Sequence, residues 1–337
     1  MSMDSNDLRS FISEIKAEYK SLPADLHITR KACALVAISE GKVIKIQEPK
    51  VHHCPLFTSL FSFEKINKEN IEKKFDKQAS QWGMFTCARK VCDEKIIVPF
   101  GASEMLMYAL KRKNIDAAVV ACEGAGTVIT SNPAVVQGIG AYMNGLFYTT
   151  PIPEVIERIE KNGGKVLSAS DSKLDQCEGV KKAAEMGYKK IAVTVRGDEQ
   201  ILDSIRDLDS SLDIVILSIC NTGINSSQAG HIRLYADLAW ACASKEVRDI
   251  AGPDSILQVG MKIPVFVLTK RGLDFISSYS SDERLRELLA DADKRHYITA
   301  NKFAEGAIKL SMGRFSIFLY ETERLPLDAD DRPEPLI

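Results

Sequence analysis

The densest group of reactive residue types in this sequence follows an uncharged apolar run at residues 117–122. Cys122 and Glu123 come first, and the stretch Gly124-Ala125-Gly126-Thr127 follows directly. Glycines let a backbone turn with positive φ and approach a ligand closely. The N–H groups of such a loop could hold a phosphate or a carboxylate. We therefore predict a ligand site at residues 124–127, with Cys122 as nucleophile or ligand and Glu123 as base.

A structural reading of the same residues is a tight strand exit whose cysteine is buried as a small apolar side chain. Two common nucleotide motifs are excluded. The loop contains GxG without the third glycine of a dinucleotide fingerprint, and it has no Gly-Lys-Ser/Thr of a P-loop.

A second polar loop, Asn221-Thr222-Gly223, follows the apolar run at residues 213–219. Its amide and hydroxyl groups could orient the same ligand, and the alternative is an Asx-type turn. Ser103 stands where a helix is expected to begin, and Arg196 follows another apolar run. Arg196 offers a two-pronged donor to a carboxylate or phosphate. We predict that both converge on the ligand site, although a helix cap and a surface charge are the commoner roles.

Thiols and imidazoles are concentrated in the first hundred residues. Cys33, Cys54 and Cys87 are the candidate ligands of a zinc ion or an iron–sulfur cluster. The spacing is unfavourable, since there is no CxxC, and ordinary free thiols are the alternative. No cofactor can be identified from these residues.

From residue 96 onward, apolar runs alternate with amphipathic helical patterns. The runs lie at residues 96–100, 117–122, 165–168, 189–195 and 213–219. Right-handed crossovers between such units give a parallel sheet with helices on both faces. We therefore predict an α/β fold with a doubly wound, mostly parallel sheet and a smaller N-terminal α+β part. In such sheets, ligands bind beyond the carboxyl ends of the strands.

The expected organisation has four parts. Residues 1–24 form an N-terminal helix that packs as an arm or a dimer contact, and residues 25–95 form an α+β part with a hairpin around Glu40-Gly41. Residues 96–270 form the parallel core. Residues 271–337 add helices near 283–292 and 301–310, an edge strand at 315–320 and a flexible acidic tail.

Composition narrows the function classes. The chain has 337 residues, of which 45% are hydrophobic and 27% charged, with a net charge of −2. That balance attracts neither nucleic acid nor an anionic membrane. No apolar run is long enough to span a membrane, and no signal peptide is evident, so we expect a cytoplasmic protein. The eight cysteines are then thiols rather than a disulfide framework.

Several segments, taken together and in order, resemble one family. They are HITRKACALVAISEGKV, EPKVHHCPL, FGASEML, CEGAGTVITSNPAVVQGIG, LDQCEGVKKAAEMGYKKIAVTV and NTGI. In combination they are similar to the methanogenesis marker protein 8 family of archaea, over residues 27–266. The resemblance implies a cytoplasmic protein of a methane-metabolising archaeon and implies no settled chemistry.

Three functions are consistent with these observations. The preferred one is an accessory protein of methane metabolism that binds a small anionic ligand or a cofactor precursor, because glycine loops predict binding more directly than chemistry. The second is a cysteine-dependent enzyme acting on a methanogenic coenzyme. The third is a metal or iron–sulfur protein that helps mature the methane-forming reductase. Expected partners are the small anion, methanogenesis enzymes and a second copy of the chain.

Overall fold

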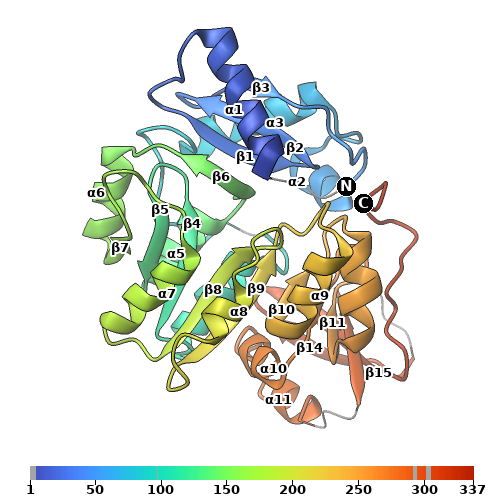
Figure 1. Ribbon diagram of the computed structural model, residues 1–337. Helices are drawn as coiled ribbons and strands as arrows, with labels where there is room; N and C mark the ends of the chain where they lie inside the picture. The colour runs from blue at the N-terminus through green and yellow to red at the C-terminus, as the bar shows by residue number, and fades with distance from the viewer. Residues whose placement is uncertain (1–4, 97, 291–293, 301–304) are drawn as a thin grey trace.

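The computed structural model describes residues 5–96, 98–290, 294–300 and 305–337, and the strands of these residues form two sheets (Figure 1). The smaller sheet belongs mainly to the N-terminal part of the chain. The larger one crosses the rest of the molecule. No helix in the described ranges combines the length and apolarity that a membrane span requires.

The small sheet is antiparallel, with strand order β3-β2-β1-β6. Its strands are β1 (His27–Lys31), β2 (Ala34–Ser39), β3 (Lys42–Ile46) and β6 (Gly145–Thr149). Glu40 and Gly41 join β2 to β3 with φ of 50° and 74°, which confirms the predicted hairpin. The fourth strand comes from residues that the sequence pattern assigned to the parallel core.

Helices cover both faces of this small sheet, because its central strands are apolar on both sides. One face packs against α1 (Ser5–Tyr19) through Phe11 and Ile15. The other face packs against α2 (Pro55–Phe61) and α3 (Lys68–Trp82). We call this sheet with its three helices the N-terminal lobe. The N-terminal helix is therefore an integral part of a packed layer.

The large sheet of the described residues has eleven strands, and it is mixed rather than mostly parallel. In spatial order they are β14 (Ile308–Met312), β15 (Phe315–Thr322), β13 (Arg295–Thr299), β11 (Leu257–Val259), β12 (Val265–Val267), β10 (Leu238–Trp240), β9 (Asp213–Ile219), β8 (Lys190–Arg196), β4 (Ala117–Cys122), β5 (Gly126–Thr130) and β7 (Gly164–Val166). Neighbours run parallel in the block β4-β8-β9-β10 and between β11 and β13. The other pairs are antiparallel. The predicted α/β class is confirmed at this coarser level.

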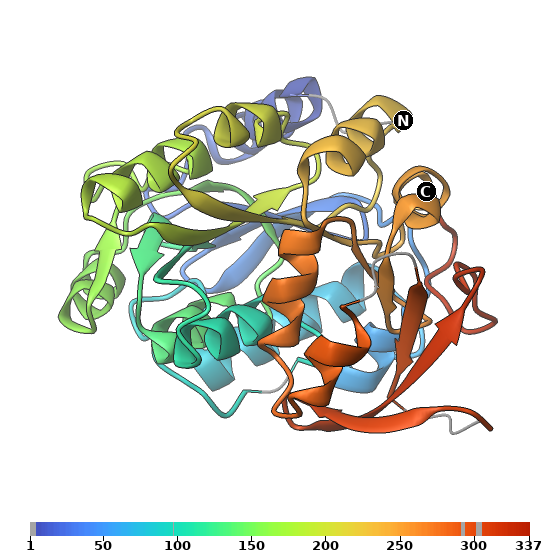
Figure 2. The same ribbon diagram turned by 90° about the horizontal axis from the view of Figure 1, so that it is seen from below.

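Helices lie on both sides of the large sheet (Figure 2). One face carries α7 (Gln176–Glu185), α8 (Leu202–Arg206), α9 (Ser226–Tyr235) and the short helices η1 (Val247–Ala251) and η2 (Gly252–Asp254). The other carries α4 (Ala102–Lys111), α5 (Pro133–Gly140), α6 (Pro153–Lys161), α10 (Lys270–Ser277) and α11 (Arg284–Leu288). The mainly apolar runs of β4, β8 and β9 follow from this, since successive side chains enter opposite cores.

The C-terminal part differs most from the sequence prediction. The helix expected at residues 301–310 is wrong from Ile308 onward, because β14 pairs there with β15; residues 301–304 lie outside the described ranges. The expected edge strand at 315–320 is internal, since β15 also pairs with β13. The helix expected at 283–292 is α11, and residues 291–293 are likewise outside the described ranges.

Residues 325–337, predicted to be a flexible tail, follow a fixed course across the molecule, and we call them the C-terminal strap. Figure 1 shows this chain rising from β15 to the N-terminal lobe. The N–H groups of His52 and His53 donate to the Glu334 carbonyl, and Glu334 donates back to His53. Ile337 donates to the Ala243 carbonyl at 2.8 Å. Backbone pairing thus holds an acidic segment that composition alone assigned to disorder.

Candidate functional site: a cavity between the two sheets

The glycine-rich loop is the buried turn of the β4–β5 hairpin. Residues 122–127 are all buried, and Gly124 and Gly126 take φ of 77° and 73°. The Gly124 N–H donates to Thr149 Oγ1 at 2.7 Å, Ala125 donates to the Cys122 carbonyl, and Thr127 donates to the Lys173 carbonyl. These donors are used within the protein and do not face solvent. The predicted anion site at Gly124, Ala125, Gly126 and Thr127 therefore has no support from this geometry.

The predicted catalytic pair is also enclosed. Cys122 is fully buried, and burial followed by the adjacent Glu123 carboxylate raises the pKa of its thiol well above the usual range. Glu123 Oε1 lies 2.5 Å from Arg89 Nε, and both side chains are at most 1% exposed. A thiol held in its protonated form is a poor nucleophile. This geometry supports the structural alternative, in which Cys122 is core and Glu123 is the partner of a buried arginine.

The second predicted loop is structural as well. The Asn221 side chain is buried, accepts from Ser218 Oγ, and donates to the Ser218 and Trp240 carbonyls. Thr222 Oγ1 accepts from Ala243 N–H at 3.2 Å. A Cβ at Gly223 would meet Cys33 Sγ at 2.5 Å, so this glycine allows a close approach to the N-terminal lobe. Asn221, Thr222 and Gly223 lie outside the cavity lining described below.

The three candidate metal ligands lie in different surroundings. Cys33 is buried against the Thr222 carbonyl, Cys54 precedes α2, and Cys87 is exposed. Across the described residues, no group of three or more His, Cys, Asp or Glu side chains is arranged to hold a metal ion. The metal site predicted at Cys33, Cys54 and Cys87 therefore stays a prediction that the described residues do not support.

A cavity of about 1020 Å³ lies between the N-terminal lobe and the carboxyl ends of β4, β8 and β9. Ala121, Thr194 and Ile219 line it from those three strands. Ser103 and Arg196, predicted to converge on a crevice, both line it too. This place follows the rule for open α/β sheets, in which the strand ends carry the binding site. The cavity is the candidate functional site.

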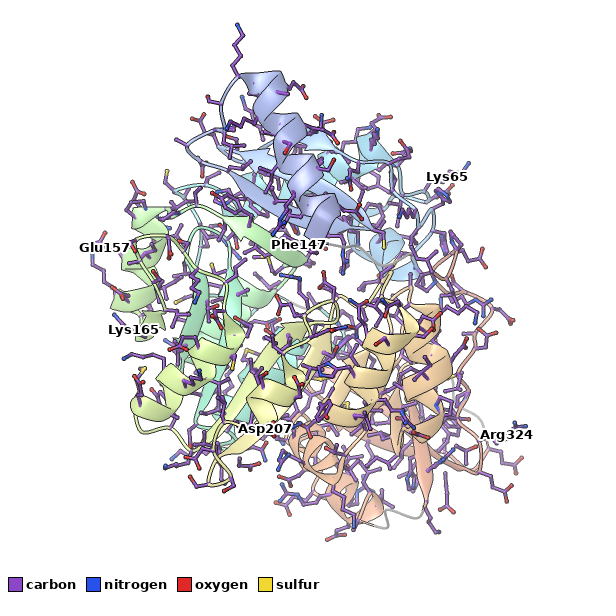
Figure 3. The ribbon with its side chains drawn as sticks, in the orientation of Figure 1. Lys65, Phe147, Glu157, Lys165, Asp207 and Arg324 are labelled. Carbon is purple, nitrogen blue, oxygen red and sulfur yellow. The ribbon has the colours of Figure 1, made fainter. Side chains whose placement is uncertain are left out.

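The Arg196 guanidinium lines the cavity and already has protein partners. It contacts Asp198, Glu199 and the Leu146 carbonyl. The guanidinium also lies over the Phe147 ring at 4.0 Å, and Arg30 lies over the same ring at 5.1 Å. Figure 3 labels Phe147 at the junction of the N-terminal lobe and the large sheet. Arg196 therefore joins the two parts rather than presenting a free fork to a ligand.

Ser103 lines the cavity and is not the N-cap of its helix. Helix α4 begins at Ala102 with Gly101 as its N-cap, and no side chain caps it. Ser103 is inside the first turn, 8% exposed, and lines the cavity. The positive end of a ten-residue helix thus faces the cavity wall.

Two lysines on the wall of the N-terminal lobe were not identified from the sequence. Lys74 is 1% exposed, and its Nζ has no hydrogen-bond partner among the described residues. Lys31 is half-buried, with its Nζ 5.0 Å from the Phe57 ring centroid. Within the described ranges, no carboxylate forms an ion pair with the side-chain nitrogen of either lysine. The signal for Lys74 was its place on the buried stripe of α3.

Backbone strain is also concentrated around the cavity. Phe100, Tyr142, Cys220 and Cys242 line it, and each has a positive φ, between 50° and 61°. Such conformations cost free energy for residues other than glycine and gather at functional sites. Cys220 directly follows β9, and Cys242 lies two residues beyond β10. These two thiols are further wall residues that the sequence did not single out.

A buried acid next to this wall gives the protein a pH-dependent stability. Burial raises the pKa of Glu104 from 4.5 to about 7, and the Arg314 cation opposes this shift. The folded state therefore holds an extra proton between these pH values. This stabilisation is complete below pH 4.5 and is lost as the pH rises through about 7. Relative to Glu104→Gln, the melting temperature of the natural protein should fall across that interval.

Thermal unfolding followed by circular dichroism checks the pH prediction, with the exposed Glu154→Gln as the matched control. Glu154→Gln should retain the natural pH profile. A Glu104→Gln profile parallel to that of the natural protein would show that Glu104 does not titrate in this range.

Comparisons with known proteins find similarity to proteins of archaea. Residues 27–280 match the family model described as "Uncharacterized protein conserved in archaea (DUF2099)". The chain is also similar to an uncharacterised protein, MJ0054, of Methanocaldococcus jannaschii. The two are 39% identical over 304 residues, which span 90% of this chain and 96% of the relative.

Proposed function

The chain belongs to the archaeal family DUF2099, and we propose that it binds a small anionic molecule with an apolar body in the cavity between its two sheets. The observation that carries this proposal is the pair Lys31 and Lys74. They stand on the wall of a cavity that is otherwise rich in aromatic and aliphatic side chains. A ligand carboxylate or phosphate would supply a counter-charge for the Lys31 ammonium and a hydrogen-bond acceptor for the buried Lys74 amine.

The remaining charges on the wall support the same ligand class. Four carboxylates line the cavity. Glu199 is paired with Arg196, Asp331 of the C-terminal strap with Lys262, and Asp328 with Arg332, so these three repel an anion less. Asp330 of the strap has no ion pair among the described residues, and we place the ligand charge at the lysines of the opposite, N-terminal lobe. The amino end of α4 adds a positive dipole at residues 101–103.

The size and composition of the cavity favour a ligand larger than a simple ion. A volume of 1020 Å³ is at the upper end of the range that small-molecule sites occupy. Phe57, Trp240 and Tyr297 are among the rings that line it. We infer that the ligand carries its charge at one end and an apolar body behind it.

An accessory role in methane metabolism is the cellular setting that we propose. Its support is the resemblance of six ordered segments to the methanogenesis marker protein 8 family. A cofactor precursor of that pathway fits the ligand class, and methanogenesis enzymes are the proposed partners.

Titration calorimetry with phenyllactate and its uncharged amide tests the binding proposal. The acid should bind and the amide should not, because only the acid satisfies the unpaired ammonium charge. Lys31→Met should weaken binding of the acid by about tenfold, as expected for loss of a charge-assisted contact. Mass spectrometry of small molecules that co-purify from the native host then identifies the natural ligand.

Lys42→Met is the matched control, because Lys42 is an exposed lysine of the same small sheet and does not line the cavity. It should bind the acid as the natural protein does. Equal affinity for the acid and the amide, or an unchanged affinity in Lys31→Met, would contradict the proposal.

A further inference from the structure

We propose that the cavity takes oxo acids and that Lys74 forms a Schiff base with their carbonyl group. This inference rests on the proposed function, because it names the class of anion and the chemistry of the same cavity. It goes further in making Lys74 a covalent partner of the ligand.

Burying the Lys74 amine costs folding free energy, which suggests that this amine has a function. Its neighbours on the buried stripe of α3 are Ile71, Phe75 and Gln78. The Lys74 Nζ lies 3.7 Å from the Phe75 ring centroid and has no acceptor among the described residues. A lysine kept for structure would be expected to pair with a carboxylate. A leucine or methionine would fill the same space without burying an amine.

The surroundings of Lys74 keep its amine in the reactive form. Burial, and next the nearby Lys31 ammonium, lower the pKa of Lys74 well below its usual range, while Cys220 opposes the shift. A neutral amine is the nucleophile in Schiff-base chemistry. Desolvation and an adjacent cation are the two devices that activate such lysines in enzymes.

The second lysine explains why the carbonyl compound should also be an acid. Lys31 is close enough to Lys74 to affect its charge, and it lines the same cavity. A carboxylate held by Lys31 would bring an adjacent carbonyl carbon toward Lys74. One oxo acid molecule can therefore pair its carboxylate with the Lys31 ammonium and offer its carbonyl group to the Lys74 amine.

The covalent step balances without any further reagent. The Lys74 Nζ lone pair forms a bond to the carbonyl carbon, and the carbonyl π bond breaks toward oxygen to give a carbinolamine. Proton transfers place a proton on that oxygen, which leaves as water as the C=N bond forms. The net reaction consumes one amine, one carbonyl compound and one proton, and it yields one protonated imine and one water.

Reductive trapping with phenylpyruvate tests the inference on the full chain. Phenylpyruvate and sodium cyanoborohydride should give one covalent adduct per chain, measured by intact-protein mass spectrometry. Peptide mapping should place the adduct on Lys74. Phenyllactate carries the same carboxylate and ring without the carbonyl, so it should bind without forming an adduct.

Two variants of α3 give the comparison. Lys74→Met should lose the adduct completely, because the thioether side chain has no amine. Lys73→Met removes an exposed lysine one residue earlier, where the ammonium is paired with Glu69, and should form the adduct at the natural rate. Circular dichroism should show that both variants are folded.

The outcomes separate this inference from the binding proposal. If phenylpyruvate and phenyllactate both bind in calorimetry but no adduct forms, the Schiff base is excluded and the binding proposal stands. If neither acid binds, the binding proposal fails and this inference fails with it. An adduct spread over surface lysines, or one unchanged in Lys74→Met, would also overturn it.

Discussion

Replacing Glu123 with glutamine is expected to destabilise the protein by about 3–5 kcal/mol, the range for removing one partner of a buried ion pair. The substitution keeps the side-chain volume and removes the charge. Arg89 would then remain 1% exposed without a counter-ion, and its partners among the described residues would be the Lys90 and Ile139 carbonyls. Urea unfolding curves of the natural protein and the variant measure the loss.

A compensating double variant shows that the loss comes from the stranded charge. Arg89→Met combined with Glu123→Leu removes both charges and keeps an apolar filling, so it should recover most of the stability. A loss below about 1 kcal/mol in Glu123→Gln would contradict the structural role and return Glu123 to the candidates for chemistry.

Replacing Lys74 with methionine should act in opposite directions on stability and on binding. The empty protein should become more stable by about 1–3 kcal/mol, because a buried amine without an acceptor is replaced by an apolar side chain of similar length. Covalent trapping of phenylpyruvate should be lost. Chemical denaturation measures the first effect, and intact-protein mass spectrometry measures the second.

Lys73→Met provides the reference for both measurements. Its ammonium is 53% exposed and paired with Glu69 at i,i+4, so removing it should change stability by less than about 0.5 kcal/mol. A Lys74→Met protein less stable than the natural one would show that the amine has a structural partner.

The sequence predicted the β4, β8 and β9 strands well because their runs are long and mainly apolar. It did not predict that residues 126–130 return antiparallel beside β4. Glycines at 124 and 126 fit a ligand loop and a hairpin turn equally well, since both need positive φ. The choice depends on Ile152 and Ser172, which cover the turn and lie far from it in the sequence.

In the candidate site, too, local sequence patterns identified some residues, whereas others are placed there by tertiary packing. Ser103 and Arg196 were found because a helix start and a strand end mark the carboxyl edge of a sheet. Lys31 and Lys74 come from the N-terminal lobe, whose placement over that edge depends on tertiary packing. Sequence periodicity nevertheless places Lys74 on the apolar stripe of α3, and that signal can be recognised without a structure.

The positions of the two tryptophans make intrinsic fluorescence a reporter of ligand binding in the cavity. The sequence has two tryptophans, and Trp240 stands on the cavity wall with its Nε1 donating to the Phe100 carbonyl at 2.9 Å. Trp82 is stacked on Tyr142 at a centroid separation of 4.7 Å. In a Trp82→Phe protein the emission would come from Trp240 alone. Its quenching or spectral shift would report occupancy of the cavity in real time, without a label.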